Sequence, residues 1–228
     1  MTFRGTQLES RARLLAGYGA DEASKYDSWI ATLTDEDHDA CVADMTRYFQ
    51  FREGMSVLDA GSGTGALCRA LVRLPGIEVT ALEPCPAMID LFKAKRDLQH
   101  IHVVPGFCDH PDDALHFASK SFDVIASRQL TNGLFDPLAA FRNWHHWLRP
   151  RGGIIVMDGL FDRSAWEGTW EGVVDTLPLS ACRTTATVPY LLEQVGFTIN
   201  FVGPMHSTNS LASTRTPRYI VVATKGDG

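Results

Sequence analysis

Short apolar runs alternate with amphipathic stretches from residue 55 onward, a pattern typical of strands interleaved with helices. The apolar runs predict strands at Ser56–Ala60, Glu78–Leu82, His100–Val104, Phe122–Ser127, Gly153–Asp158, Phe197–Gly203 and Arg218–Ala223. Helical spacing of apolar residues predicts helices at Gly65–Arg73, Pro86–Arg96, Pro137–Leu148 and Val188–Val195. Such alternation predicts an α/β fold, a doubly wound and mostly parallel sheet with helices on both faces.

Residues 1–50 have a different pattern, which predicts an N-terminal helical lid ahead of a domain spanning 51–228. Within it, Thr34 followed by Asp37 predicts a capping box at the start of a helix. Cys41, Met45 and Phe49 then recur every four residues on one face of that helix.

The alternation of strand-like and helix-like segments stops between about residues 160 and 187. This irregular stretch predicts an insertion on the substrate side of the sheet. Trp166 and Trp170 lie in this insertion, four residues apart. They form either an apolar wall for a ring-bearing substrate or a small core of the insertion itself. Residues Pro204 to Thr216 are polar and are predicted to be a loop.

Composition narrows the partners of this 228-residue chain, which is 45% hydrophobic and has a net charge of −6. That apolar fraction predicts a folded core, and the absence of a basic run argues against nucleic acid and favours a small molecule. No apolar stretch is long enough to span a bilayer and the first residues do not resemble a signal peptide, so we expect a cytoplasmic protein without membrane contact. We expect it to be a monomer or a homodimer. The five cysteines are scattered without a C-x-x-C pair, which supports no thiolate metal site.

The most informative segment is Val57-Leu58-Asp59-Ala60-Gly61-Ser62-Gly63-Thr64-Gly65, where an apolar strand runs into a glycine-rich turn that opens a helix. Such a turn lets the backbone approach a ligand closely. The spacing also satisfies the dinucleotide fingerprint, and Glu83 follows about 20 residues later, where a ribose-binding carboxylate is expected. The turn alone therefore leaves two cofactor classes open.

Asp59 separates those two classes, because it ends the strand two residues before the first glycine of the turn. A carboxylate about 4 Å from a pyrophosphate costs on the order of 4 kcal/mol per unit charge at an effective dielectric constant of about 20. S-adenosylmethionine (SAM) has no phosphate, and its sulfonium and ammonium groups are positively charged. Asp59 therefore favours SAM over a dinucleotide.

Four segments together resemble the class I SAM-dependent methyltransferases of the small-molecule type: D-A-G-S-G-T-G, A-L-E-P-C-P-A-M, F-D-V-I-A-S-R-Q and L-R-P-R-G-G-I-I-V-M-D-G. The resemblance is best over Met55 to Asp158. It implies a seven-stranded sheet whose last strand is antiparallel, with the cofactor over the carboxyl ends of the first strands. The product of the cofactor would be S-adenosylhomocysteine (SAH).

The resemblance also implies the cofactor contacts. The turn would line the methionine and ribose side, Glu83 would bind the ribose hydroxyls, and Asp109 would meet the adenine amino group, because Phe107 occupies a position that is often acidic. Tyr26, in a segment similar to the lid of small-molecule members, would cover the cofactor or pack into the core. The expected cofactor-binding residues are Tyr26, Asp59, Gly61, Ser62, Gly63, Glu83, Pro84, Met88, Cys108, Asp109 and Ser127.

Candidates for the chemistry itself end strands at the same edge. Arg128 is expected to contact the substrate or the methionine end, or else to pair with a surface acid. Asp158 is a candidate base or substrate anchor, or a cap for the next turn, and His206 suits proton removal near neutral pH. His145 and His146 are expected to lie away from this edge, on a flanking helix.

The predicted function is transfer of the methyl group to an O or N nucleophile, in preference to S or C, of a small, ring-bearing metabolite such as those of bacterial secondary metabolism. Because the sulfonium is already activated, the protein's main contribution would be to align the reactants. Two alternatives remain open: a SAM-binding sensor or scaffold without turnover, and a nicotinamide-dependent reductase that uses the same turn.

Overall fold

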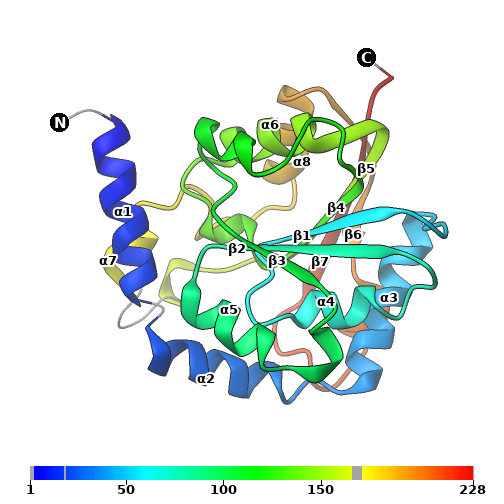
Figure 1. Ribbon diagram of the computed structural model, residues 1–228, viewed down its shortest axis with the longest axis horizontal. Coiled ribbons are helices and arrows are strands. Elements are labelled where there is room, and N and C mark those ends of the chain that lie inside the picture. The colour runs from blue at the N-terminus through cyan, green and yellow to red at the C-terminus, as the bar shows by residue number, and fades with distance from the viewer. Residues whose placement is uncertain (1–2, 18, 166–170, 228) are drawn as a thin grey trace.

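The computed structural model describes residues 3–17, 19–165 and 171–227 and contains one seven-stranded sheet (Figure 1). The strands lie in the order β3-β2-β1-β4-β5-β7-β6, and β7 runs antiparallel to both of its neighbours. The expected doubly wound, mostly parallel sheet with an antiparallel last strand is confirmed. Its strands are β1 (Ser56–Ala60), β2 (Glu78–Glu83), β3 (His102–Pro105), β4 (Phe122–Arg128), β5 (Leu148–Gly159), β6 (Phe197–Pro204) and β7 (Arg218–Lys225).

Strand β5 is longer than its apolar run predicts. Its register with β4 shifts between Phe122 and Val124, and Arg151 adopts a left-handed φ of 62° in the irregular part. Pro150 and the paired glycines, which predict a break, are therefore accommodated inside a distorted strand rather than in a separate loop.

Helices cover both faces of the sheet (Figure 1). One face is covered by α6 (Pro137–Trp147) and α8 (Thr187–Gln194), through a core that includes Phe141, Trp144 and Leu192. The other face is covered by α3 (Asp35–Tyr48), α4 (Ala66–Leu71) and α5 (Pro86–Lys93). His145 stacks edge-on against Phe197, in agreement with the packing role expected from the sequence.

The N-terminal helices occupy two different places. In α3, the Thr34–Asp37 capping box forms as expected, and Cys41 and Met45 pack into the core of the sheet face. By contrast, α1 (Phe3–Gly17) and α2 (Ala20–Ile30) lie across the edge where the parallel strands end, and α2 packs along α5 (Figure 1). Among the N-terminal helices, these two therefore occupy the position of a lid.

The segment after β6 contains a short helix, α9 (His206–Asn209), where the sequence predicts only a polar loop. The carboxylate of Asp44 in α3 accepts hydrogen bonds from the backbone N–H groups of Ser207 and Thr208, each at 2.8 Å. Because this contact comes from a residue more than 150 positions away, local sequence gave no sign of it. The insertion contains a second short helix, α7 (Glu171–Val174).

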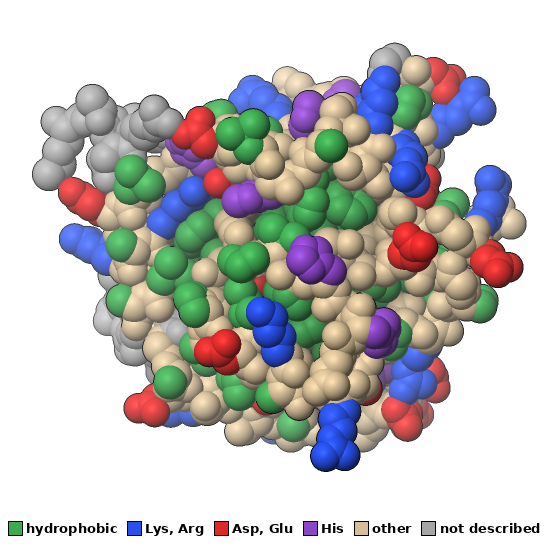
Figure 2. Space-filling model, viewed as in Figure 1, with side chains coloured by type: hydrophobic (Ala, Val, Ile, Leu, Met, Phe, Trp, Pro, Cys, Tyr) green, Lys and Arg blue, Asp and Glu red, His purple; other side chains and the backbone are tan. Residues whose placement is uncertain are grey.

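None of the helices in the described part of the chain has the length and apolar character that a membrane crossing requires. The face shown in Figure 2 carries acidic and basic side chains interspersed with apolar ones.

Candidate active site

A cavity of about 410 Å³ opens at the carboxyl ends of the parallel strands, beneath α1 and α2. This is the edge at which doubly wound sheets bind their ligands. Its wall consists of Leu14, Tyr26, Gly61, Gly63, Leu82, Glu83, Pro84, Met88, Gly106, Phe107, Cys108, Asp109, Arg128, Gln129, Leu130, Asn132, Gly133, Leu134, Phe161, Leu177 and Thr216.

The glycine turn gives the cavity a backbone floor. Gly61 and Gly63 adopt left-handed φ angles of 69° and 54°, which side-chain-bearing residues rarely adopt. A Cβ atom on Gly61 would lie 2.6 Å from a methyl carbon of Leu130, so a side chain there is also sterically excluded. The turn therefore requires glycine at this position both for its conformation and for its packing.

Glu83 ends β2 with its carboxylate held by the turn. One oxygen accepts a hydrogen bond from the backbone N–H of Gly63 and the other from that of Cys85, both at 2.9 Å. Burial raises the pKa of Glu83 to about 7, although both backbone hydrogen bonds lower it. The carboxylate is thus fixed at the cavity wall, as ribose binding requires.

Asp59 lies beneath the turn and is not part of the cavity wall. One of its oxygens accepts a hydrogen bond from the Cys68 thiol at 3.1 Å, and the other has no partner among the described residues. Burial raises its pKa to about 7. The structure therefore does not place Asp59 in the cavity wall, and a cofactor contact for this residue remains a prediction.

The hydroxyls of Ser62 and Ser127 are also buried without a hydrogen-bond partner in the described structure. With the free Asp59 oxygen, they leave three buried polar atoms without a partner near the turn, which is costly unless water or a ligand pairs with them. Like Asp59, neither serine belongs to the cavity wall. The acceptor that does line the cavity is the Glu83 carboxylate, which suits the hydroxyls of a nucleoside such as SAM.

Pro84, Met88 and Cys108 line the part of the cavity where the adenine is expected. Asp109 lies there too, but its carboxylate is already engaged. It accepts hydrogen bonds from the Arg11 guanidinium at 2.5 Å and from the backbone N–H of Phe135 at 2.6 Å. Contact of Asp109 with adenine remains a prediction, and the structure gives this residue a second role in holding α1.

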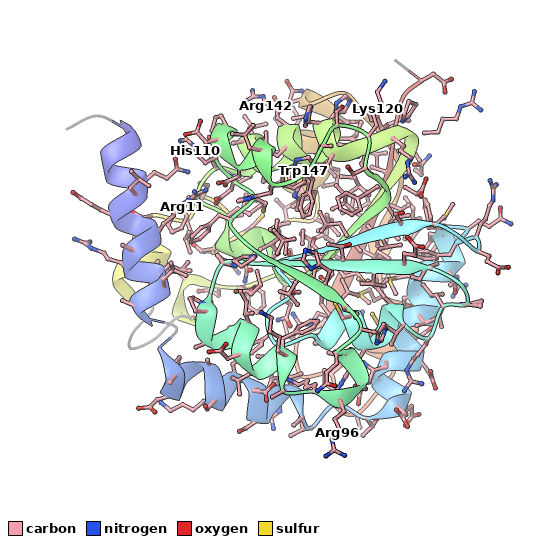
Figure 3. The ribbon with its side chains drawn as sticks, viewed as in Figure 1. Arg11, Arg96, His110, Lys120, Arg142 and Trp147 are labelled. Atoms are coloured by element: carbon pink, nitrogen blue, oxygen red, sulfur yellow. The ribbon has the colours of Figure 1, made fainter. Side chains whose placement is uncertain are left out.

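Arg11 is a site residue that the sequence reasoning missed. It projects from α1 toward the body of the domain (Figure 3), lies 4.4 Å from the centre of the Phe107 ring, and also bonds Asp113 at 2.7 Å. Gln7 on the same helix donates to the Asp109 carbonyl at 3.2 Å. The spacing of Gln7, Arg11 and Leu14 on one helical face was the available signal.

Tyr26 of α2 lies against the turn. Its ring carbon is 3.6 Å from the place where a Cβ on Gly63 would be, and the ring contacts Trp29 at 5.7 Å between centroids. Burial raises the pKa of its hydroxyl. Of the two sequence interpretations, the structure places Tyr26 in the cavity wall.

Arg128 and Arg218 meet beyond the turn. Both guanidinium nitrogens of Arg218 reach the side-chain oxygen of Gln129, at 2.8 and 3.0 Å. Burial, together with the charge of nearby Arg128, lowers the pKa of Arg218 to about 10. Arg218, which the sequence reasoning did not select, comes from the antiparallel strand β7 and reaches this site only because β7 lies beside β5.

The structure does not place Asp158 or His206 in the cavity wall. Asp158 is buried and accepts hydrogen bonds from the backbone and hydroxyl of Thr131, so it holds the turn after β4 rather than the turn that follows Asp158 itself. Burial raises its pKa to about 6. His206 is exposed at the start of α9 and belongs to neither cavity wall. Trp166 and Trp170 lie outside the described residues.

Comparison with known proteins agrees with this site. Residues 58–156 match the methyltransferase domain family. The chain is 26% identical over 159 residues to a ubiquinone/menaquinone biosynthesis C-methyltransferase of a Shewanella species, covering 68% of this chain and 63% of that protein. It is 29% identical over 108 residues to the ubiquinone biosynthesis O-methyltransferase of Cereibacter sphaeroides, covering 47% and 42%.

A solved structure of a SAM-dependent methyltransferase from Aquifex aeolicus has the same fold, with a TM-score of 0.65, 16% identity, and coverage of 91% of this chain and 98% of that one. The fold and the comparisons agree with the class I SAM-dependent methyltransferases, the class that the sequence motifs resemble. Residues 58–156 are similar to a methyltransferase domain, and SAM is the cofactor of the neighbour from Aquifex aeolicus. The matched segments span only 42% to 63% of the length of the two relatives.

Proposed function

We propose that this protein transfers a methyl group from SAM to an O or N nucleophile of a small, ring-bearing molecule. The observation that carries the proposal is the Glu83 carboxylate, which the backbone N–H groups of Gly63 in the turn and of Cys85 after β2 fix at the wall of a cavity of about 410 Å³. The two relatives, named for C- and O-methylation in quinone biosynthesis, support a ring-bearing acceptor and keep carbon open as the acceptor atom.

SAM supplies a methyl group on a positively charged sulfur. The acceptor's lone pair would form the new bond to the methyl carbon while the carbon–sulfur pair moves to sulfur, and the acceptor proton would leave to water or a base. The residues of this chain contribute alignment and exclusion of water. Tyr26 and Leu14 close the cavity from α2 and α1, and Glu83 and the turn fix the donor.

The proposed cofactor sites follow the same logic. Glu83 would hold the ribose hydroxyls, Gly61 and Gly63 would present backbone to the methionine side, and Pro84 and Met88 would enclose the adenine. Arg128 belongs both to the wall of this cavity and to the wall of a second, adjoining cavity. It would therefore meet either the methionine carboxylate of SAM or the acceptor.

Binding and turnover test the proposal separately. Calorimetry should show SAH binding and no comparable NADH binding, since buried carboxylates at the turn repel a pyrophosphate. Incubation of SAM with a library of hydroxylated and amino-substituted ring compounds should then yield SAH above background. Tight NADH binding without SAH binding would support the reductase instead, and SAH binding with no turnover on any acceptor would support a sensor.

A further inference from the structure

A second cavity of about 210 Å³ adjoins the first, because Arg128 and Thr216 belong to both walls. It lies between helices α2 and α3, the ends of β4 and β5, and the segment that leads into β7. Its wall consists of Trp29, Leu33, Asp37, His38, Cys41, Ala66, Arg128, Met157, Met205, Thr208, Ser213, Thr214, Arg215, Thr216 and Arg218. We call it the acceptor chamber.

Three arginines face the acceptor chamber: Arg128, Arg215 and Arg218. None of them forms an ion pair with a carboxylate within residues 3–17, 19–165 and 171–227. Arg218 is partly buried, and its hydrogen bonds go to the neutral amide of Gln129. Burial and the nearby Arg128 both lower the pKa of Arg218, and the charge of buried Asp158 offsets this lowering only in part.

The acid in the chamber wall, Asp37, offsets one of these three positive charges at most. It accepts hydrogen bonds from the backbone and hydroxyl of Thr34, each at 2.8 Å, and from Ser213 at 2.5 Å. Although burial opposes them, these hydrogen bonds lower the pKa of Asp37, so it carries a single negative charge near neutral pH. His38 adds no negative charge, and burial together with the charges of Arg73, Arg69 and Arg128 lowers its pKa and favours the neutral imidazole.

The nearest other carboxylates lie behind the wall. Asp59 interacts electrostatically with Arg128, and Asp158 with Arg218, but both carboxylates are fully buried and bonded to Cys68 and Thr131, respectively. Burial raises the pKa of Asp59 to about 7 and that of Asp158 to about 6, so near neutral pH each offsets less than a full charge. The chamber therefore retains an excess of positive charge.

We propose that the acceptor of this enzyme carries a carboxylate, which the guanidinium of Arg218 binds in the acceptor chamber beside Arg128. The inference rests on the proposed methyl transfer and names the chemical class of its acceptor. SAM brings two positive centres against one carboxylate, so its binding increases the demand for an anion. Even with the SAM carboxylate on Arg128, Arg218 is left for the acceptor.

The size of the chamber limits that acceptor. At about 210 Å³ it is smaller than the roughly 300–1,000 Å³ of pockets that hold drug-sized ligands. Trp29, Cys41 and Met157 add an apolar surface suited to a ring. A single-ring aromatic acid combines the two features, and arginine binds its carboxylate through two parallel hydrogen bonds.

The test compares matched acids and amides as ligands of the SAH-saturated protein. Benzoate, salicylate and 3,4-dihydroxybenzoate would be titrated against their uncharged amides and followed by ligand-observed NMR and calorimetry. The acids should bind at least about tenfold more tightly than the amides, in line with a charge-assisted hydrogen bond. In Arg218→Gln this preference should disappear while SAH binding stays within about threefold, and Arg218→Lys should restore part of it.

Arg47→Gln is the matched control, because Arg47 is exposed on α3 and lies over Tyr48, outside the wall of the chamber. It should keep the full preference for acids. Equal binding of acids and amides, no binding of either, or an unchanged preference in Arg218→Gln would each overturn the inference. If the wild-type protein does not bind SAH at all, that result would instead contradict the proposed function. If Arg218→Gln does not fold, Arg215→Gln, at an exposed position in the same wall, should lower the acid preference in its place.

Discussion

At the scale of single residues, the site depends on carboxylates that the fold keeps partly protonated. Glu83 and Asp59 are both buried, and burial raises the pKa of each to about 7. Removing water strengthens their interaction with a cationic ligand, but it also opposes their ionisation when no ligand is present. If these carboxylates hold the cofactor as proposed, its binding is coupled to proton release at this turn.

Replacement of Glu83 tests its assignment to the ribose. Glu83→Gln keeps the size of the side chain and one acceptor oxygen but loses the charge that binds a pair of hydroxyls. We expect SAH to bind about ten- to a hundredfold more weakly, corresponding to roughly 1.5–3 kcal/mol for a charged hydrogen bond. Calorimetry measures this change. Glu78→Gln, at the exposed start of the same strand, should bind SAH like the wild type, and equal weakening in both variants would count against the assignment.

The raised pKa values predict the pH dependence of binding. SAH should bind more tightly as the pH rises from about 5.5 to 8, since Asp59 and Glu83 ionise in this range and its ammonium keeps its charge. The same titration with Asp59→Asn should show a smaller rise. An affinity that stays constant or falls over this range would show that the two carboxylates do not govern binding.

At the scale of elements, α1 is fastened to the domain by hydrogen bonds from Arg11 and Gln7. Arg11 bonds Asp109 and Asp113, and its side chain is 11% exposed. In Arg11→Ala the carboxylate of Asp109 would keep only the N–H of Phe135, so α1 should detach more often. We expect faster hydrogen exchange in α1 and about tenfold faster SAH dissociation.

Arg13→Ala provides the control for that experiment, because Arg13 is exposed on the same helix. It should leave both hydrogen exchange and SAH dissociation unchanged. If the two variants behave alike, the Arg11 contacts do not fasten α1.

Helix α9 provides a second test at this scale. Asp44→Ala removes the acceptor for two backbone N–H groups of α9 and should lower the free energy of unfolding by roughly 1–3 kcal/mol, measured by urea denaturation. Asp39→Ala on the same helix loses only a solvent-exposed ion pair with Arg73 and should cost less than about 1 kcal/mol. A smaller loss in Asp44→Ala than in Asp39→Ala would mean that α9 does not depend on this cap.

At the scale of the whole molecule, the buried carboxylates also influence stability. In the folded protein the pKa values of Asp59 and Glu83 are about 7 and that of Asp158 about 6, above their ordinary values of 3.8 for Asp and 4.5 for Glu. A carboxyl group whose pKa is raised in the folded state contributes its full stability when the pH lies below its ordinary pKa. This contribution to stability is lost as the pH rises through the pKa of the folded state.

The ligand-free protein should therefore have a lower Tm at pH 8 than at pH 5.5, and Glu83→Gln should show a shallower decline. SAH should raise the Tm more at pH 8, where it pairs with ionised carboxylates. Scanning calorimetry at both values checks the two statements. A ligand-free Tm that rises over this interval would contradict the first, and an equal SAH effect at both pH values would contradict the second.

Local sequence was sufficient for much of the fold. The predicted strands at residues 56–60, 78–82 and 122–127 lie within a residue of the observed β1, β2 and β4, because a buried parallel strand needs a continuous apolar run. The glycine turn and Glu83 were identifiable for a similar reason, since their backbone conformation and spacing are short-range properties.

The sequence by itself thus determined the order of elements, the turn and the position of the Glu83 carboxylate at the end of β2, all of which depend on residues near one another along the chain. Only the tertiary structure decided that Arg11 would bind Asp109, that Asp158 would hold the turn at Thr131 and that Arg218 would face the acceptor chamber. These pairs join residues from distant segments, and their contacts follow from how helices and strands pack, which periodicity does not encode. The protonation state of the buried carboxyl groups likewise depends on burial, and burial exists only once the chain has folded.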